Sequence, residues 1–423
     1  MRKLLSFLLT LIILFCAGCS HAPSNDPISD IPSKDEPIKD NPQTSTTELV
    51  STNELDSVLF NYLENDCSYS EKNYIFSPLS FKYAITLASY GANNTTREEL
   101  LKAMKFSSID DNLSWASNFN NFVSEFNNRA EEDFKILSKY DKTLSKPNRR
   151  LVVANSVWHN LDSEGKIKNS YVEYVNQSFN GDAFNLKGDE LTPKINEWVN
   201  EKTNGLIPSL FQQPLTDKNT ILINSLYLKA PWAYEFLEHN TQKKKFNGMT
   251  EIKEIDFMNT VEDFKFYKDN DSTLIVLPLE GGINCALIMG DSKNAFDEID
   301  KAEYQYTDLY IPKFEIETTF NNGELVNFLK KNGVKLAFDE EKSDFSNLID
   351  ETNIFIDNIV QKAKIITDEE GIEAAAVTAI TFDNAAAITP KEPVTICFDK
   401  PFKFFIYTEE SQEILFFGNF CNP

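Results

Sequence analysis

The sequence is poor in the residues from which most catalytic and metal sites are built. Its 423 residues include three histidines and 14 glycines. His21 lies in a polar N-terminal stretch, and neither His159 nor His239 is close to a Gly-x-Ser-x-Gly turn or a similar nucleophile motif. Metal-ligand spacings and Gly-rich phosphate loops are also missing. We therefore expect neither an enzyme nor a protein that carries a metal ion or cofactor.

Positive charge is scarce as well. Lys and Arg number 41 against 65 Asp and Glu, which gives a formal net charge of -24. Surfaces that bind nucleic acids or heparin-like polyanions need clustered Lys and Arg. The only basic run is the three lysines at 243–245, which we expect to form a solvated turn. The composition argues against nucleic acid as a partner and against activation by heparin-type molecules.

Flexible linkers and long apolar runs are absent after residue 50. No later segment has the length and apolar composition of a membrane span. One compact unit is therefore expected over residues 49–423, with 33 Phe available for its core. Cys67, Cys285, Cys397 and Cys421 show no zinc or redox spacing. We expect buried free thiols, although pairing stays open in an exported chain.

The first 48 residues have the composition of a targeting signal followed by a tether. Arg2 and Lys3 precede an apolar run over residues 4–15, and the small residues before Cys19 resemble a bacterial lipobox. Residues 1–18 are then a signal peptide and Cys19 is the lipidated residue. Cys16 stands where that motif usually has Leu, so an ordinary secretory signal is the alternative.

Residues 19–48 are rich in Pro, Ser and Asp. This composition is too polar to bury and predicts a disordered tether. We therefore expect an exported lipoprotein that is anchored to a membrane at the cell surface or is extracellular.

Helical patterns dominate the first half of the compact unit, and strand patterns dominate the second. Ser77-Pro78 starts a helix that Gly91 ends, and residues 168–204 are expected to be helical. Residues 221–228 are apolar on both faces, as in a central strand that is covered on two sides. Further strands are expected near 255–267, 273–279, 283–289, 307–318, 354–366, 394–398, 402–408 and 413–420. This order gives a mixed α+β fold.

The most informative stretch is DEEGIEAAAVTA, residues 368–379. Every second side chain after Ile372 is small or apolar and suits the buried face of a strand; these are Ala374, Ala376, Thr378 and Ile380. The run lacks the bulky apolar residues that hold an ordinary strand in a core. It has the pattern of a loop that is able to become a strand.

This stretch resembles the hinge of the serpins, which trap proteases by inserting a cleaved loop into their own sheet. The similarity extends in order to NYIFSPLS at 73–80, LINSLYLKAPW at 222–232, PKF at 312–314, PF at 401–402 and FGNFCNP at 417–423. It implies a serpin-like α+β fold for residues 49–423. That fold has a large central, mostly antiparallel sheet, N-terminal helices and an exposed reactive-centre loop.

The resemblance also implies roles for individual residues. Ser77, Ser80 and Asn224 match the polar cluster beneath the opening of the main sheet. Gln361 stands where serpins commonly have His, and Trp232 matches the Trp at the top of the sheet. The hinge comprises Glu369, Glu370, Gly371, Ile372, Glu373, Ala374, Ala375 and Ala376, with Ile372 in place of the usual small hydroxyl residue.

Two counts place the cleaved bond differently. Counting forward from Gly371 gives Ala385–Ala386, whereas counting back from Pro401 gives a bond near Pro390. We use the first count, because the length on the hinge side fixes how far a protease is carried. Small Ala residues suit elastase-like or subtilisin-like proteases with shallow primary pockets.

The function that the resemblance implies is suicide inhibition of serine proteases, with cysteine proteases as further candidates. The cleaved loop would insert into the central sheet while the protease is held as an acyl-enzyme. The alternative is a serpin-fold protein that does not inhibit and acts as a surface binding or scaffold module. A monomer without cofactors is expected in either case.

Overall fold

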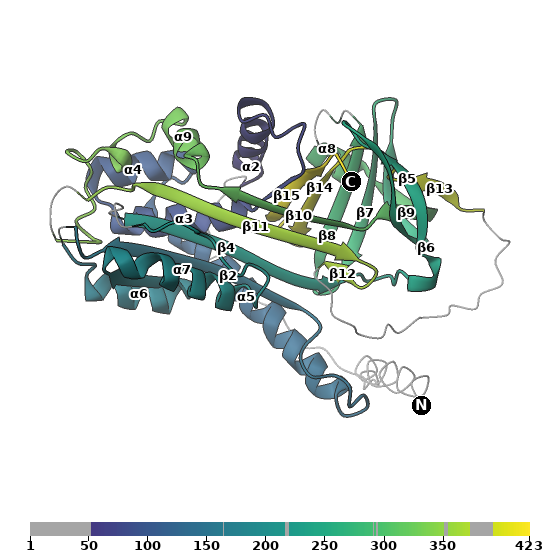
Figure 1. Ribbon diagram of the computed structural model, residues 1–423, viewed down its shortest axis with the longest axis horizontal. Coiled ribbons are helices and arrows are strands. Elements are labelled where there is room, and N and C mark those ends of the chain that lie inside the picture. The colour runs from purple at the N-terminus through teal and green to yellow at the C-terminus, as the bar shows by residue number, and fades with distance from the viewer. Residues whose placement is uncertain are drawn as a thin grey trace, which may run out of the picture. The chain divides into compact units, whose positions relative to one another are not determined.

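The computed structural model describes residues 52–163, 165–215, 220–290, 292, 295–350, 354–372 and 392–423. The helices are α2 (Thr52–Asn61), η1 (Tyr62–Asp66), α3 (Pro78–Gly91), α4 (Asn94–Ala103), α5 (Ile109–Leu137), α6 (Asn169–Phe179), α7 (Gly188–Lys202), η2 (Glu238–Asn240), α8 (Ala295–Lys301), α9 (Glu324–Lys331) and η3 (Leu336–Phe338). Helices precede most of the strands along the chain, as the sequence predicts (Figure 1).

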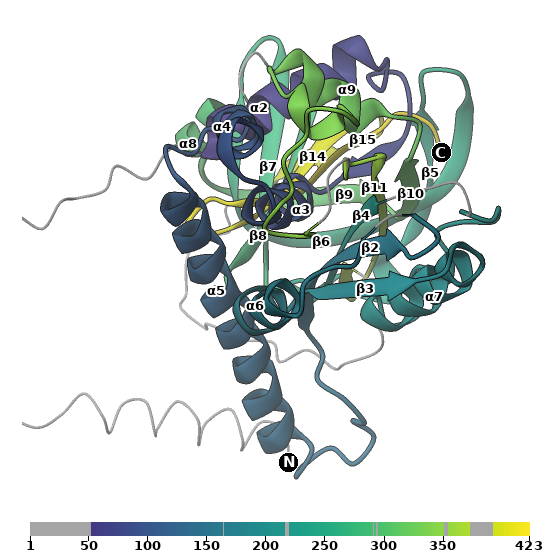
Figure 2. The ribbon, with the colours of Figure 1, turned by 90° about the vertical axis from the view of Figure 1, so that its left-hand side faces the viewer.

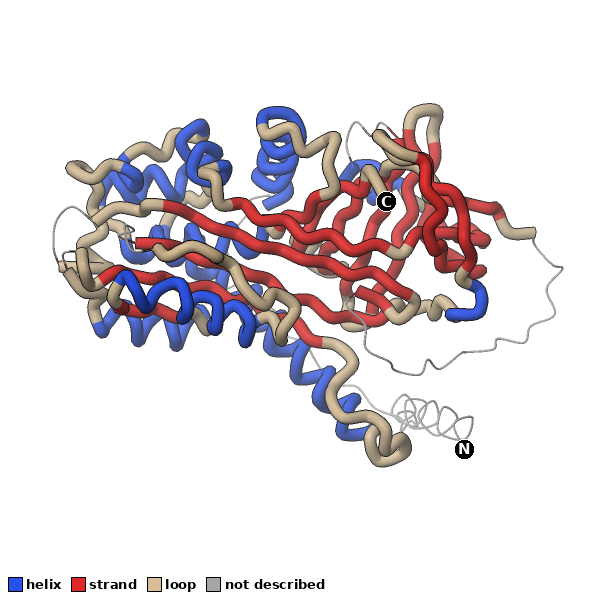
Figure 3. Tube along the Cα trace, in the orientation of Figure 1, coloured by secondary structure: helices blue, strands red, loops and turns tan. Residues whose placement is uncertain are grey.

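The strands form two sheets, drawn in red in Figure 3. They are β1 (Tyr74–Phe76), β2 (Arg150–Asn160), β3 (Asp182–Leu186), β4 (Thr220–Pro231), β5 (Gln242–Asn247), β6 (Ile252–Lys268), β7 (Ser272–Leu279), β8 (Ile283–Gly290), β9 (Glu303–Pro312), β10 (Phe314–Phe320), β11 (Asn358–Asp368), β12 (Gly371–Ile372), β13 (Val394–Cys397), β14 (Phe402–Thr408) and β15 (Ile414–Phe420).

The six-stranded sheet, called the main sheet below, has the order β10-β11-β12-β4-β2-β3. Most of its neighbours are antiparallel, but β2 with β3 and β11 with β4 pair in parallel. Both faces are covered. Leu222 and Leu226 of β4 pack into the large core with α3, while Ile221 and Ile223 pack against α7 on the opposite face. Figure 2 shows α3 and α7 on opposite sides of this sheet. The predicted two-sided burial of residues 221–228 is confirmed.

Helix α3 runs through the interior beside the main sheet and β15, and nearly all its residues are buried. Ser77 caps its first turn, since the Ser77 side chain accepts a hydrogen bond from the Ser80 amide, and Pro78 occupies the first helical position. The predicted start and end of this helix are confirmed. Its burial fixes the serines at its N-terminus close to the strands of the main sheet.

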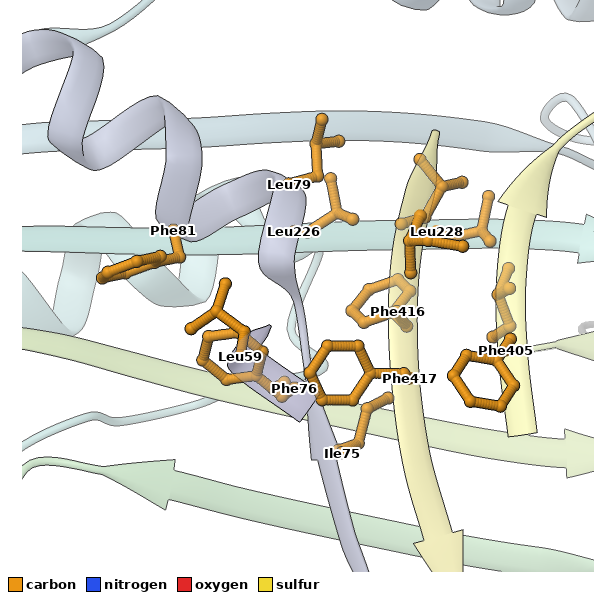
Figure 4. Packing of buried hydrophobic residues seen from close by; sticks show 14 of the residues in the cluster. Leu59, Ile75, Phe76, Leu79, Phe81, Leu226, Leu228, Phe405, Phe416 and Phe417 are labelled. Carbon is orange, nitrogen blue, oxygen red and sulfur yellow. The ribbon is translucent and has the colours of Figure 1, made fainter. Parts of the chain in front are cut away.

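The nine-stranded sheet has the order β1-β15-β14-β8-β7-β6-β9-β13, with β5 paired to β6. Aromatic and aliphatic side chains fill the space between it and α3, as Figure 4 shows for Phe76, Phe81, Phe405 and Phe417. Removing one such buried Phe costs about 3–5 kcal/mol in typical proteins. The Phe-rich composition is thus concentrated in this core.

Three local predictions are wrong. The strand expected near 307–318 is two strands, since β9 ends at Pro312 and β10 begins at Phe314 in the other sheet. Residues 168–204 are not continuously helical, because α6 ends at Phe179, Asn180 follows in a left-handed conformation, and β3 precedes α7. The half-buried side chains of β3 give little periodicity, so pairing with β2 decides its structure. The lysines at 243–245 lie in β5 and not in a turn, because the backbone of this polar segment pairs with β6.

The four cysteines of the described residues are free thiols. Cys285 and Cys421 are buried as expected, whereas Cys67 and Cys397 are only half-buried. Burial raises the pKa of the Cys285 thiol to about 12, which keeps it protonated at neutral pH. Among the described residues, no helix combines the length and apolar character needed to cross a membrane.

Candidate functional site at the opening of the main sheet

Strands β11 and β4 meet differently at their two ends. In the closed part, they pair directly in parallel from Asn358 opposite Ile221 to Gln361 opposite Asn224. In the open part, the two strands are separated and the short strand β12 lies between them. There Ile372 pairs with Thr367 on one side and with Ala230 on the other. The hinge therefore occupies the first positions of a slot between two strands (Figure 1).

A tight turn leads from β11 into β12, and Trp232 holds it. The Asp368 carboxylate accepts a hydrogen bond from the Glu370 amide at 3.0 Å. The Trp232 indole donates to the Asp368 carbonyl at 2.8 Å, and the Trp232 amide donates to the Glu370 carbonyl at 3.1 Å. Trp232 thus lies at the open part of the main sheet and binds the backbone of the turn directly. It also packs edge-on against Phe236 at 5.8 Å between ring centroids.

Gly371 is required by the space between the strands. Its φ is 152°, and a Cβ there would lie 2.3 Å from the Ala230 carbonyl oxygen and 2.7 Å from Pro231 Cα. Neither neighbour is a flexible side chain, so no larger residue fits. The Ile372 side chain that follows is buried, at 3% exposure. The apolar residue in place of a small hydroxyl residue is therefore accommodated on the core face.

Glu369 is tied to two other segments. Its carboxylate lies 2.5 Å from Lys313 Nζ and accepts a hydrogen bond from Thr241 Oγ1 at 2.7 Å. Burial alone would raise the pKa of Glu369, but the hydrogen bonds from Lys313 and Thr241 outweigh it and lower the pKa. The lowered pKa favours the ionised form of Glu369.

The surroundings of the Asp368 and Glu370 carboxyl groups disfavour their ionised forms. Burial raises the pKa of Asp368 and that of Glu370, and the negative charge of Asp368 raises the latter further. Oε2 of Glu370 is buried and has no hydrogen-bond partner among the described residues. The open part of the sheet is thus bordered by three carboxyl groups, and within the described residues Glu369 is the one with a cation in direct contact.

The closed part is held by neutral groups. Gln361 Oε1 accepts from the Ser77 amide at 2.8 Å, and Gln361 Nε2 donates to the Ser77 carbonyl at 2.9 Å and to Asn224 Oδ1 at 2.8 Å. The Ser80 hydroxyl donates to the same Asn224 oxygen at 3.1 Å. All four side chains are buried. Gln361 satisfies the cluster without a titratable group, as its donor and acceptor atoms allow.

The structure therefore brings the predicted residues together in two groups. Ser77, Ser80, Asn224 and Gln361 form the closed part, and Trp232 with Glu369, Glu370, Gly371 and Ile372 forms the open part. Sequence reasoning missed Thr241 and Lys313 as partners of Glu369. Lys313 lies within the PKF motif at 312–314, but that motif does not show which carboxylate the lysine meets.

Other predicted site residues fall outside the described residues. These are the signal and tether residues with Cys19, the hinge residues Glu373, Ala374, Ala375 and Ala376, and the bond between Ala385 and Ala386.

Comparisons with known proteins agree with this geometry. A sequence model of the family described as "Serpin (serine protease inhibitor)" matches residues 51–423. An uncharacterized serpin-like protein from Thermococcus kodakarensis is 27% identical, over 98% of this chain and 98% of the relative. The native state of Tengpin, a thermophilic serpin, matches with a TM-score of 0.71 and 23% identity over 94% of this chain and 98% of its own. Human thyroxine-binding globulin in complex with thyroxine matches with a TM-score of 0.72 and 21% identity over 89% and 99%.

Proposed function

This chain belongs to the serpin family, and we propose that it is a suicide inhibitor of serine proteases that traps its target by inserting the cleaved loop into the main sheet. The observation that carries the proposal is the position of β12, which already lies between β11 and β4. The family is associated in general with protease inhibition.

The first step is chemistry of the protease. Its serine hydroxyl, or a cysteine thiol, attacks the carbonyl carbon of Ala385, and the bond to the nitrogen of Ala386 breaks. The amine leaves with a proton supplied by the general acid of the protease. An ester or thioester then links Ala385 to the protease, and the hinge side of the loop becomes a free strand with the protease at its end.

Extending the register of β12 predicts how that strand would lie. Because Ile372 pairs with Ala230 and Thr367, Ala374 would lie opposite Leu228 and Ile365. By the same register, Thr378 would lie between Asn224 and Gln361. Directly opposite residues share a face of a sheet, so the small side chains would face the core beside α3.

The charge in the run also fits this register. Glu373 is the one charged residue between Gly371 and Phe382, and it would lie opposite Lys229 on the other face. Fifteen inserted residues at about 3.3 Å each would carry the protease roughly 50 Å. New ladder hydrogen bonds at about 1 kcal/mol net each, together with buried apolar surface, supply on the order of 10 kcal/mol.

A substitution on the core face of the inserted strand tests the proposal. Wild-type protein mixed with an elastase-like protease is expected to form a covalent adduct that survives SDS. Ala376→Arg is expected to abolish the adduct and leave cleaved protein, because a charge at that position would have to be buried between Leu226 and Ala363. The measurement is the ratio of adduct to cleaved protein on a gel.

Ala387→Arg is the matched control, since residue 387 lies beyond the cleaved bond and would not insert. An adduct of unchanged yield with Ala376→Arg would exclude insertion in this register. If the wild type is only cleaved by elastase-like and subtilisin-like proteases at every ratio, the chain is a non-inhibitory serpin-fold binding or scaffold protein. Thyroxine-binding globulin, whose fold is similar, was solved with a bound small molecule.

We also propose that the protein is an exported, monomeric lipoprotein anchored through Cys19. The positive residues Arg2 and Lys3 and the apolar run over 4–15 support this proposal. Recovery of a Cys19→Ser variant in the membrane fraction, at the level of the wild type, would contradict it.

A further inference from the structure

A fifth polar residue borders the closed part and takes no part in its hydrogen bonds. Asn155 of β2 is 2% exposed, and neither Nδ2 nor Oδ1 has a hydrogen-bond partner among the described residues. It lies directly opposite Asn224 in the antiparallel pair of β2 with β4. Its neighbours Val153 and Val157 pack in the core that contains α3, so Asn155 faces the same side. A buried amide without partners disfavours this state of the protein.

Asn224 has its partners on one side in this structure. Its Oδ1 accepts from Ser80 of α3 and from Gln361 of β11, and its Nδ2 donates to the Val360 carbonyl of β11 at 3.4 Å. The amide of Asn224 is thereby directed toward α3 and β11, and away from Asn155. Two of its three hydrogen bonds depend on β11 staying next to β4.

Inserting a strand would separate Asn224 from its partners on β11 and leave its neighbours on β2 in place. The pairing of β11 with β4 would have to open from Asn358 to Gln361, and the partners on β11 would move away by about 4.8 Å, one strand spacing. The pairing of β2 with β4 extends from Arg150 to His159 and is not interrupted. Asn155 would therefore stay opposite Asn224, with about 4.5–5.5 Å between the two Cβ atoms, a separation that two amide side chains can bridge.

We propose that Asn155 is a positioning residue for loop insertion, which gives Asn224 a new hydrogen-bond partner when β11 leaves. This inference rests on the proposed trapping function. The amide of Asn155 is unsatisfied before insertion and satisfied after it. Asn155 thus disfavours the native sheet and favours the sheet that contains the inserted loop. Both effects promote insertion.

The test compares native and loop-cleaved protein by thermal unfolding. Asn155→Leu keeps a similar size without polar atoms. The native form is expected to unfold at the same temperature as the wild type or higher, and the cleaved form at a lower temperature. In Asn155→Leu, the difference between the unfolding midpoints of the cleaved and native forms is expected to narrow by several degrees. Insertion slows by up to about fivefold, the factor that corresponds to one net hydrogen bond, so more inhibitor is cleaved for each protease trapped.

Ser225→Ala is the matched control. Ser225 is the next residue of β4, is 2% exposed, and its hydroxyl also lacks a partner among the described residues, but its side chain points to the opposite face. Its removal is expected to shift both midpoints alike and leave the gap unchanged. Asn155→Ala serves as a second variant if Leu does not fit.

The outcomes separate this inference from the proposed function. If cleavage raises the midpoint of the wild type and raises that of both Asn155 variants equally, Asn155 has no role in insertion, whereas the trap stands. If cleavage does not raise the midpoint of the wild type, the trap itself is wrong and this inference falls with it.

Discussion

The two ends of the slot between β11 and β4 are held by different chemistry. At the open end, near the surface, ionised side chains and a tight backbone turn hold the hinge, through Lys313 with Glu369 and through Trp232. At the closed end, in the interior, neutral amides and hydroxyls join the strands, through Gln361 and Asn224. The open end already contains a strand, and the closed end excludes one.

The two ends of the slot therefore differ in how easily they would open during loop insertion. Lys313 is partly exposed, and an ion pair with one solvated partner contributes little to stability and is screened by salt, so the open end adjusts easily. A buried amide network costs much more to break, since every lost hydrogen bond leaves a polar group without a partner. We infer that the hinge is poised at the open end and that the closed end sets the barrier.

The largest effect is expected at the closed end. Gln361→Leu leaves the Ser77 amide and carbonyl and Asn224 Oδ1 with fewer partners, and is expected to lower the free energy of unfolding of the native form by about 2–4 kcal/mol. The loop-cleaved form should lose less, because insertion would already have separated Gln361 from Asn224. Urea unfolding of both forms measures the two losses.

Ser80→Ala is the control for this experiment, because its single hydrogen bond to Asn224 comes from α3 and is expected in both forms. It should lower the stability of both by about 1 kcal/mol. Equal losses for Gln361→Leu in the native and cleaved forms would show that the closed end does not open.

A smaller effect is expected for the turn at the open end. In Gly371→Ala the new methyl group overlaps the Ala230 carbonyl, so β12 leaves the slot at a cost of about 1–3 kcal/mol. Departure of the turn would uncover the buried Trp232 indole, and its contact with water should shift tryptophan fluorescence to longer wavelength. Gly205→Ala isolates the backbone cost, since Gly205 also has a positive φ, 86°, but nothing within 4 Å of the added methyl group. Identical spectra for Gly371→Ala and the wild type would mean that β12 stays in place.

The smallest effect is expected for the ion pair between Glu369 and Lys313. Glu369→Gln should lower stability at pH 7 by about 0.5–1 kcal/mol, less at high salt, because Lys313 is partly exposed. The pKa of Glu369 is lower in the folded state, so its contribution is present above the unfolded-state value of about 4.3 and is lost as the pH falls through the folded value. The difference between variant and wild type should therefore vanish in acid.

Glu370 should behave in the opposite way. Its pKa is raised in the folded state, so ionised Glu370 lowers stability, and this loss is relieved as the pH falls through the raised pKa. Glu370→Gln should accordingly stabilise the hinge at neutral pH and not in acid. The effect of Gln361→Leu should not follow either titration, because its cluster contains no titratable side chain. The free energy of unfolding, measured against pH for the wild type and for Glu369→Gln, Glu370→Gln and Gln361→Leu, tests these three expectations.

Much of the fold follows from local patterns. The helix from Pro78 to Gly91 is marked by a cap and a terminal Gly, and the two-sided apolar run of β4 marks a central strand. Strand β3 and strand β5 could not be predicted in the same way. The first has half-buried side chains and the second is largely polar, so their pairing with β2 and β6 decides their structure.

The sequence by itself determined the family resemblance and the hinge composition, because these depend on residue type and order. That position 371 requires glycine was decided by the tertiary structure, which places it against the backbone of Ala230 and Pro231. Only the tertiary structure decided that Glu369 meets Lys313, that Gln361 spans Ser77 and Asn224, and that Asn155 has no partner among the described residues. These residues are between about 50 and 280 positions apart along the chain. Hydrogen bonds and ion pairs act over a few Å, so only folding brings such groups within range.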